Sequence, residues 1–253
     1  MADVGHEEIM KHILALLLSC VATCIAEGQS ISFDIDSVGV IIDDGINQNI
    51  GTGFVFGRNR DVITCAHVAA ERTNLVYDSI DPTNKEVRLS LKYILPRFDL
   101  AVLTMNEGSP FPLKPVELGD IKRIRPGDTV MYVGWKQGTQ LLAVNTAVVT
   151  ATGSVVNDGA IVEFLEFEGE GRPGYSGGPV FSTKGEVIAI MREAWTKRGV
   201  KGGPEILVNR AFSVGILSTL EEEVFTRVMV STNAPSNLSL LEASGIIDAG
   251  EKR

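Results

Sequence analysis

The chain has 253 residues, of which 44% are hydrophobic and 22% charged, and its formal net charge at pH 7 is −9. This composition is typical of a globular protein and excludes disordered, collagen-like and coiled-coil classes. The sequence has no Lys/Arg cluster that could form a basic stripe for phosphates, so we expect no nucleic-acid partner.

The first predicted element is an apolar run near the amino terminus. Residues 13–26 (ILALLLSCVATCIA) carry no charge; they are too few to span a bilayer but match a signal-peptide core. Met10 and Lys11 precede the run, and small residues end it before Glu27. We therefore predict a signal peptide over residues 1–26 with translation starting at Met10, an exported (periplasmic or secreted) protein, and no stable membrane insertion. The alternative is an uncleaved buried helix.

From residue 37 to residue 215, short runs rich in β-branched residues alternate with Gly, Pro, Asn and Asp. Strands this closely spaced, without intervening helices, are typical of antiparallel sandwiches or barrels. Residues 114–128, rich in Pro, Gly and charge, are the best candidate for a linker between two β halves. The predicted strands are Ser37–Ile42, Gly53–Phe56, Val62–Thr64, Glu86–Leu95, Leu100–Met105, Thr129–Trp135, Ala143–Val156, Ile161–Phe167, Pro179–Ser182, Val187–Met191 and Leu207–Val214.

One helix is predicted, late in the chain. Residues 218–221 (STLE) have the form of a capping box, and Leu220, Val224 and Val228 repeat every four residues to give an apolar stripe. After Ser231 the pattern weakens, and we expect a loosely held tail.

The strongest local signal is a serine framed by glycines. Residues 174–178 (GYSGG) allow a tight turn that brings backbone N–H groups close to a reacting carbonyl, although a Gly-rich hairpin with an incidental serine is the simpler alternative. The segment also matches the elbow of α/β-hydrolases, but those need a histidine after the serine, and none follows Ser176. A histidine must then precede it, as in the two-barrel serine proteases or subtilisin. The subtilisin fold needs long helices that the pattern does not supply.

His67 and Asp99 are the candidate partners of Ser176. The other two histidines precede the predicted folded part, and His67 ends an apolar strand, where a lone histidine is more often a packed core side chain. Asp99 begins another apolar strand, where a carboxylate is costly to desolvate unless it is paired, and an imidazole N–H is a natural partner. The alternative is a strand-initiating or turn aspartate. Asp78 and Asp81 are rivals, but we expect both in a polar loop.

The cysteines limit the chemistry further. After removal of residues 1–26, Cys65 is the only cysteine, so no internal disulfide can form. Cys65 and His67 are too few for a His/Cys zinc site, and we predict neither a metal nor another cofactor. We expect Cys65 to be a buried core thiol and not a nucleophile.

Three segments together resemble the catalytic blocks of trypsin-like serine proteases: residues 64–68 (TCAHV), 98–103 (FDLAVL) and 173–179 (PGYSGGP). A closer resemblance, to the bacterial HtrA-like branch, lies in residues 51–54 (GTGF), 185–190 (GEVIAI) and 211–214 (AFSV). The resemblance covers about residues 37–228. It implies an all-β, chymotrypsin-like fold of two six-stranded antiparallel β-barrels with a C-terminal helix. The predicted organisation is a signal peptide over 1–26, a barrel with His67 and Asp99 over 27–120, a barrel with Ser176 and the helix over 121–230, and a tail over 231–253.

The chain departs from the family pattern in two places. HtrA-like proteins usually continue into a peptide-binding PDZ domain, and we expect none here. Digestive relatives carry an aspartate before the serine that pairs with a new amino terminus on zymogen cleavage; Tyr175 stands there and cannot form that ion pair. We therefore expect no activation by such a cleavage.

The resemblance implies a serine endopeptidase that acts on polypeptides. Ser176 would attack the peptide carbonyl, His67 would take and return the proton, and Asp99 would fix the imidazole tautomer. The backbone N–H groups of Gly174 and Ser176 would form the oxyanion hole. The alternative is a catalytically silent protease-fold module that binds peptide strands by β-addition. The oligomeric state stays open.

Four residues are candidates for substrate binding. Glu170 lies six residues before Ser176, where digestive relatives place an acid that selects basic side chains, but it is more simply a loop glutamate neutralised by Arg172. Met191 suggests an apolar pocket wall instead. Arg192 and Glu193 are candidates for lining the groove, with a surface ion pair as the simpler alternative.

Overall fold

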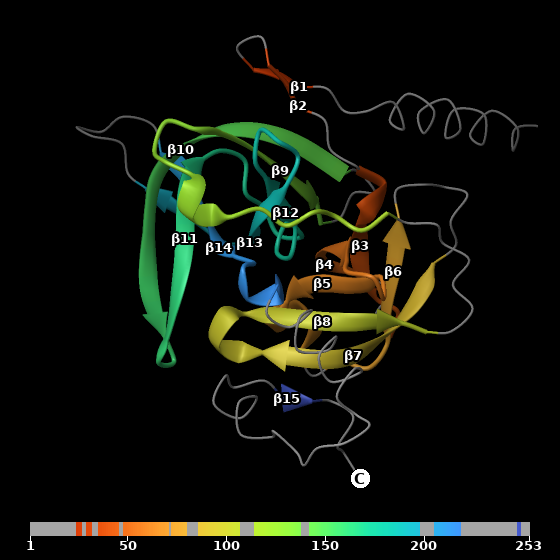
Figure 1. Ribbon diagram of the computed structural model, residues 1–253. Helices are drawn as coiled ribbons and strands as arrows, with labels where there is room; N and C mark the ends of the chain where they lie inside the picture. The colour runs from red at the N-terminus through yellow and green to blue at the C-terminus, as the bar shows by residue number, and fades with distance from the viewer. Residues whose placement is uncertain are drawn as a thin grey trace, which may run out of the picture.

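The computed structural model describes residues 24–26, 29–31, 35–45, 48–70, 72–79, 86–106, 114–137, 142–197, 205–218 and 247–248. Within these ranges nearly all regular structure is β, and the pairings between named strands are antiparallel. The strands form two closed sheets, which lie side by side in Figure 1. The predicted all-β fold of two six-stranded barrels is confirmed.

The first barrel follows the order β7-β6-β3-β4-β5-β8, and a β7–β8 pairing closes it. A short strand, β15 (Ile247–Asp248), adds to β7 from outside the ring. The bounds of the six strands are β3 Val38–Asp43, β4 Gln48–Phe56, β5 Asp61–Cys65, β6 Leu75–Ser79, β7 Val87–Leu95 and β8 Leu100–Met105.

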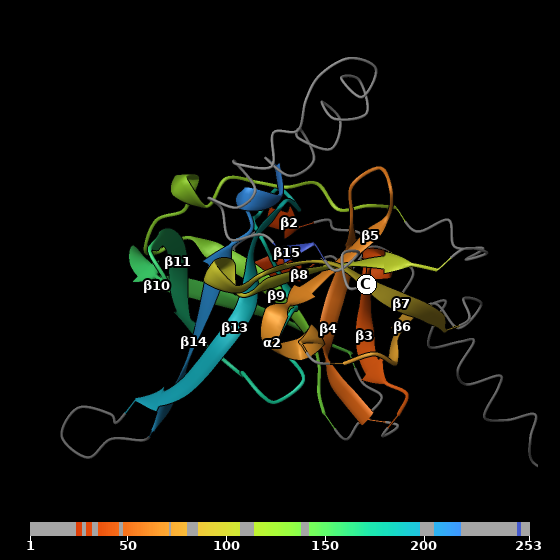
Figure 2. The same cartoon turned by 90° about the horizontal axis from the view of Figure 1, so that it is seen from below.

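The second barrel closes in the order β10-β11-β14-β13-β12-β9. Its longest strands are β10, with 16 residues, and β13, with 11. β10 extends beside β11 as a long twisted pair (Figure 1), and β13 extends beside β14 (Figure 2). The bounds are β9 Thr129–Trp135, β10 Leu142–Asn157, β11 Ala160–Glu168, β12 Pro179–Phe181, β13 Val187–Lys197 and β14 Ile206–Ser213.

Each barrel is filled by the apolar side chains that alternate along its strands. Phe54 and Ile63 are fully buried in the first barrel, as Phe167 is in the second. Met131 and Ile190, from β9 and β13, belong to the same apolar cluster as the first barrel's core. The two barrels therefore share an apolar boundary.

Short elements connect the strands. Residues 114–128 precede β9 and touch both barrels, because Val116 bridges to Phe56 and Leu118 bridges to Val187. The short helices are η1 (Ile35–Ser37), α2 (Ala66–Ala69), η2 (Pro96–Phe98) and η3 (Ile121–Arg123), and a helical turn covers residues 216–218. The described ranges contain no helix that is both long and apolar enough to cross a bilayer.

The structure adds one strand that the sequence did not predict in the barrels. Residues 75–79, expected in part as a polar loop around Asp78, form β6 and pair with β3 and β7. Asp81 lies outside the described residues, as do Leu220, Val224 and Val228 of the predicted helix and residues 1–23. Around the predicted cleavage site, β1 (Cys24–Ala26) pairs with β2 (Gln29–Ile31), and the signal peptide stays a prediction.

Candidate active site

His67 lies on α2, the single helical turn that follows β5, at the boundary between the two barrels (Figure 2). Its side chain is 49% exposed. Its Nδ1 atom lies 2.8 Å from Asp99 Oδ2, and its backbone N–H donates to Asp99 Oδ1 at 3.1 Å. Two bonds to one carboxylate fix both the backbone and the ring of His67, and leave Nε2 on the other side of the ring.

Asp99 occupies a left-handed backbone conformation (φ 52°, ψ 41°) at the end of η2, immediately before β8. Aspartate tolerates this conformation better than most residues. The Asp99 carbonyl accepts the N–H of Ala66 at 2.9 Å, which ties the turn to the start of α2. The side chain is buried, and its carboxylate is satisfied by donors, as a buried charge requires.

Ser176 lies in the loop between β11 and β12, and this loop is seated on the first barrel. Its carbonyl accepts the N–H of Thr52 at 2.8 Å, and the Thr52 hydroxyl donates to the Gly174 carbonyl at 2.7 Å. The same hydroxyl accepts the N–H of Trp135 at 2.9 Å. Thr52 is fully buried. It therefore links β4, β9 and the serine loop, a role that no sequence motif indicated.

Glycine is required at two positions of this loop because both backbones have positive φ and no room for a side chain. At Gly174 (φ +98°) a Cβ would lie 2.2 Å from the Trp135 carbonyl oxygen. At Gly177 (φ +87°) it would lie 2.1 Å from the Thr52 carbonyl oxygen. The loop can therefore approach the first barrel only through glycine.

Contacts around Gly51 show how closely the serine and histidine segments approach. A Cβ at Gly51 would lie 2.7 Å from Cγ1 of Val68, the residue after His67, and 3.0 Å from the Ser176 carbonyl oxygen. A Cβ at Gly177 would lie 3.2 Å from the backbone nitrogen of Cys65. The segments that carry His67 and Ser176, distant in sequence, therefore meet at the barrel boundary.

The carbonyl groups of residues 173–176 in the serine loop all accept hydrogen bonds. Pro173 O accepts the N–H of Gln137 at 3.0 Å, and Tyr175 O accepts the N–H of Gly178 at 2.9 Å. The Gly174 and Ser176 carbonyls bind Thr52, as described above. Among the described residues, no acceptor is bonded to the backbone N–H groups of Gly174 and Ser176.

Tyr175 and Cys65 are core residues. Tyr175 is buried beside Tyr132 (ring centroids 6.4 Å apart) and Gly134, and burial raises the pKa of its hydroxyl. Cys65 is fully buried and its Sγ donates to the Met191 carbonyl at 3.2 Å. Burial, and secondly the Asp99 carboxylate, raise the pKa of the Cys65 thiol. The expectation of a buried core thiol is confirmed.

Cys65, His67 and Asp99 are also the one group among the described residues whose ligand atoms lie close enough, within 4.8 Å of one another, to suggest a metal ion. The donor set does not fit one. The Cys65 thiol is fully buried and donates to the Met191 carbonyl, and Asp99 Oδ2 is already bonded to Nδ1 of His67 and to Nε of Arg192.

The four candidate substrate-binding residues lie in different environments. Glu170 is partly exposed and paired with Arg172. The Met191 side chain is buried in the core of the second barrel. Arg192 pairs with Glu193 at 3.6 Å, and it also contacts Asp99 at 2.9 Å, which the sequence did not indicate.

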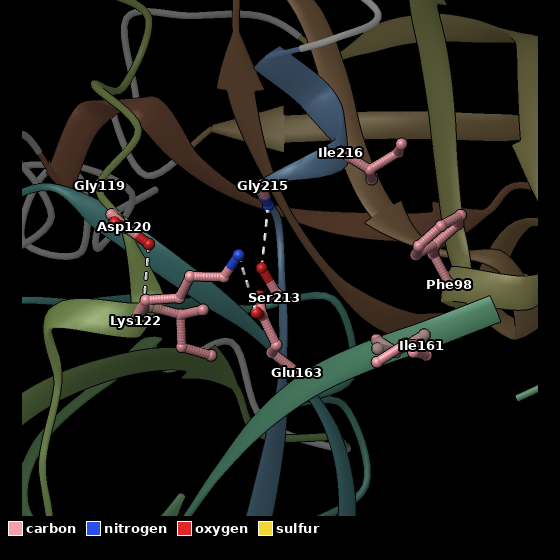
Figure 3. Close-up of a pocket in the computed structure, with 11 residues that line it drawn as sticks. Phe98, Gly119, Asp120, Lys122, Ile161, Glu163, Ser213, Gly215 and Ile216 are labelled. Atoms are coloured by element: carbon pink, nitrogen blue, oxygen red, sulfur yellow. Dashed lines mark hydrogen bonds and ion pairs between the residues drawn. The ribbon is translucent and has the colours of Figure 1, made fainter. Parts of the chain in front are cut away.

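A cavity of about 330 Å³ lies between the barrels, away from the candidate active site (Figure 3). Phe98 and Ile216 line one side, and Asp120 and Lys122 lie across from them. The Asp120 carboxylate accepts the N–H of Lys122, and Lys122 Nζ pairs with Glu163 at 3.2 Å. None of the three predicted catalytic residues lines this cavity.

Comparison with known proteins identifies a matching protein family. Residues 51–190, just over half of the chain, match the family model described as a trypsin-like peptidase domain. The "Probable periplasmic serine endoprotease DegP-like" of Pseudomonas putida (strain GB-1) is 32% identical over 152 residues, 60% of this chain and 31% of that protein. A protein of the same description from Marinomonas sp. (strain MWYL1) is 27% identical over 179 residues, 71% of this chain and 37% of that protein. The chain spans about a third of the length of these relatives.

Solved structures share the fold. The Rv3671c protease from M. tuberculosis in its active form has a TM-score of 0.57 at 20% identity, over 73% of this chain and 79% of that one. An HtrA-type protease, a variant of AlgW with a tripeptide, has a TM-score of 0.59 at 19% identity, over 83% of this chain and 68% of that one.

Proposed function

The chain belongs to the trypsin-like peptidase family, as its three sequence blocks predicted, and from that membership we propose that it is a serine endopeptidase. Ser176 is the nucleophile, His67 the general base and acid, and Asp99 the residue that fixes the imidazole. The relatives and the solved structures named above are proteases, which supports the reaction class.

The observation that carries the proposal is the state of the serine loop. Its four carbonyls, from Pro173 to Ser176, are bonded away from the N–H groups of Gly174 and Ser176. Two free N–H groups beside a nucleophile are what an oxyanion hole needs, and donors fixed before the reaction cost no reorganisation during it. This favours a competent enzyme over a silent peptide-binding module, in which a collapsed loop would suffice.

The proposed reaction follows from these positions. The neutral imidazole of His67 takes the Ser176 hydroxyl proton at Nε2 as Oγ attacks the peptide carbonyl, because the bond of Nδ1–H to Asp99 leaves Nε2 as the basic nitrogen. The N–H groups of Gly174 and Ser176 bind the developing oxyanion, each contributing about 10²–10³ in turnover. His67 then protonates the leaving amine, and water hydrolyses the acyl-enzyme by the same steps in reverse.

Labelling with a fluorophosphonate probe tests the assignment. The parent chain should form a covalent adduct at Ser176, and Ser176→Ala should abolish it. His67→Ala should reduce the labelling rate by several orders of magnitude, because the hydroxyl loses its base. Ser182→Ala, which removes another serine of the same barrel, serves as the matched control and should label like the parent. A parent chain that is never labelled would refute the proposal and favour the peptide-binding module.

We extend the proposal to substrate and location. The relatives' names describe periplasmic endoproteases, so we propose that this chain is exported and cleaves polypeptides. Casein hydrolysis that stops with the serine-directed probe tests the substrate class. Mass spectrometry of the protein isolated from cells tests export, because removal of residues 1–26 places Glu27 at the amino terminus.

A further inference from the structure

Arg192 occupies a β-bulge in β13, facing the first barrel. The pairing of β13 with β14 changes register between Met191 and Glu193, so Arg192 is the extra residue of the strand. A bulge releases its residue from the ladder and re-aims its side chain. The Arg192 side chain crosses the barrel boundary, where its Nε lies 2.9 Å from Asp99 Oδ2.

Two neighbours besides Asp99 hold the Arg192 side chain in this direction. Its guanidinium carbon lies 4.4 Å from the centroid of the Phe212 ring, a favourable cation–π geometry. Its Nε lies 3.6 Å from Glu193 Oε1, and Glu193 in turn lies 3.7 Å from Arg210. The side chains of Arg192 and Asp99 are only 22% and 11% exposed, so solvent screens their contact weakly.

Few other charges act on Asp99. The charged and titratable groups on the described elements packed around it are His67 on α2, the Cys65 thiol on β5, Arg97 on η2, and Arg192 with Glu193 on β13. Arg97 pairs with Asp158 at 3.6 Å, and the Cys65 thiol is neutral because burial raises its pKa. Of these groups, Arg192 is a permanent cation whose guanidinium lies within ion-pair distance of the Asp99 carboxylate.

We infer that Arg192 is a positioning residue that acts through Asp99. It holds the Asp99 carboxylate in place across the barrel boundary, and its positive charge weakens the electrostatic effect of that carboxylate on His67. The inference rests on the proposed function, since it concerns the proposed triad. His67 Nδ1 and Arg192 Nε share one carboxylate oxygen, at 2.8 and 2.9 Å. A cation on that oxygen weakens the attraction between the carboxylate and a protonated imidazole. Activity that needs neutral imidazole then persists to lower pH.

The test is the pH profile, from pH 5 to pH 9, of the second-order rate of fluorophosphonate labelling of the full chain. In Arg192→Gln the acidic limb, which is the rise of the labelling rate with pH, should move to higher pH by about half to one unit. The plateau, which is the maximal labelling rate, should fall about tenfold because Asp99 loses the contact that holds it in place. Arg192→Lys keeps the charge but lacks the planar guanidinium, so its limb should stay near the parent's while its plateau falls.

Lys92→Gln is the matched control. Lys92 is the bulge residue between β7 and β8, it pairs with Asp61 at 2.7 Å, and the two side chains are 25% and 12% exposed. This variant should have the same pH dependence and the same maximal labelling rate as the parent. An Arg192→Gln profile that coincides with the parent's would overturn the inference while leaving the proposed function intact. If Arg192→Gln fails to fold, an Arg192→Lys plateau equal to the parent's overturns the positioning role. A parent chain without labelling at any pH overturns both proposals.

Discussion

The residues of the candidate site stand where the backbone is most constrained. Asp99 sits in a left-handed turn, and Gly174 and Gly177 have positive φ in the serine loop. Each constraint is matched by contacts: Ala66 and His67 bind Asp99, and Thr52 binds the loop. Unfavourable backbone conformations that are held by their surroundings in this way are common at functional sites.

Gly177 offers a direct test of how tightly the serine loop is seated. In Gly177→Ala the new Cβ would lie 2.1 Å from the Thr52 carbonyl and 2.2 Å from the Thr64 hydroxyl, so the loop must move. We expect a loss of about 2–3 kcal/mol in unfolding free energy and at least about 10²-fold in labelling rate. Chemical denaturation and probe kinetics measure the two effects.

Gly127→Ala is the control for backbone strain alone. Gly127 has φ +98°, but nothing lies within 4 Å of the position of a Cβ. We expect a loss of about 1–2 kcal/mol in unfolding free energy and an unchanged labelling rate. Equal labelling rates for Gly177→Ala and Gly127→Ala would show that close seating of the loop does not matter for the chemistry.

The residues of the site differ in how far the sequence could predict them. His67, Asp99 and Ser176 each belong to a local pattern, an apolar strand or a glycine-framed turn, and the three patterns together predicted the candidate triad, although each alone had a structural alternative. The contact of Arg192 with Asp99 could not, because it depends on a bulge in β13 and on the approach of two barrels. Thr52 was missed for the same reason: its bonds reach residues about 80 or more positions away.

Among the elements, β6 was not predicted because its apolar and polar residues do not alternate. Leu75, Val76 and Tyr77 are buried, but Asp78 follows them and polar residues flank the strand. Asp78 is only partly exposed, and burial, with the nearby Glu86 carboxylate as the second cause, raises its pKa to about 6. A charged residue at this position makes the sequence of the strand resemble that of a polar loop.

The raised pKa of Asp78 predicts how stability depends on pH. The folded chain holds this proton more tightly than the unfolded chain, in which an aspartate has a pKa near 3.8. The contribution of Asp78 to stability is therefore fully present below about pH 4 and is lost as pH rises through about 6. Allowing for solvent screening, we expect Asp78→Asn to be more stable than the parent by about 1–2 kcal/mol at pH 7.5 and to differ little at pH 4.

Urea denaturation at the two pH values measures this difference. Asp158→Asn is the control, because the Asp158 side chain is 79% exposed and its replacement should leave the pH dependence as in the parent. Glu86→Gln should weaken the effect by removing the second cause of the shift. An Asp78→Asn chain that loses as much stability as the parent between pH 4 and pH 7.5 would contradict this account of β6.

At the scale of the whole molecule, the candidate site belongs to neither barrel alone. The first barrel supplies His67 and Asp99, and the second supplies the serine loop and Arg192. An apolar boundary that includes Met131 of β9 holds the barrels together. The two-barrel fold was predictable from the order of histidine and serine and from the family resemblance, whereas the contacts across the boundary depend on how the two sheets pack.

We propose that the serine loop is already shaped to bind an oxyanion beside His67. The most direct measurement is a crystal structure of the chain reacted with a peptide boronic acid, whose tetrahedral adduct mimics the intermediate. We predict boron bonded to Ser176 Oγ, with one boronate oxygen about 2.7–3.1 Å from the backbone nitrogens of Gly174 and Ser176. An unmodified Ser176, or a boronate oxygen turned away from both nitrogens, would contradict this proposal.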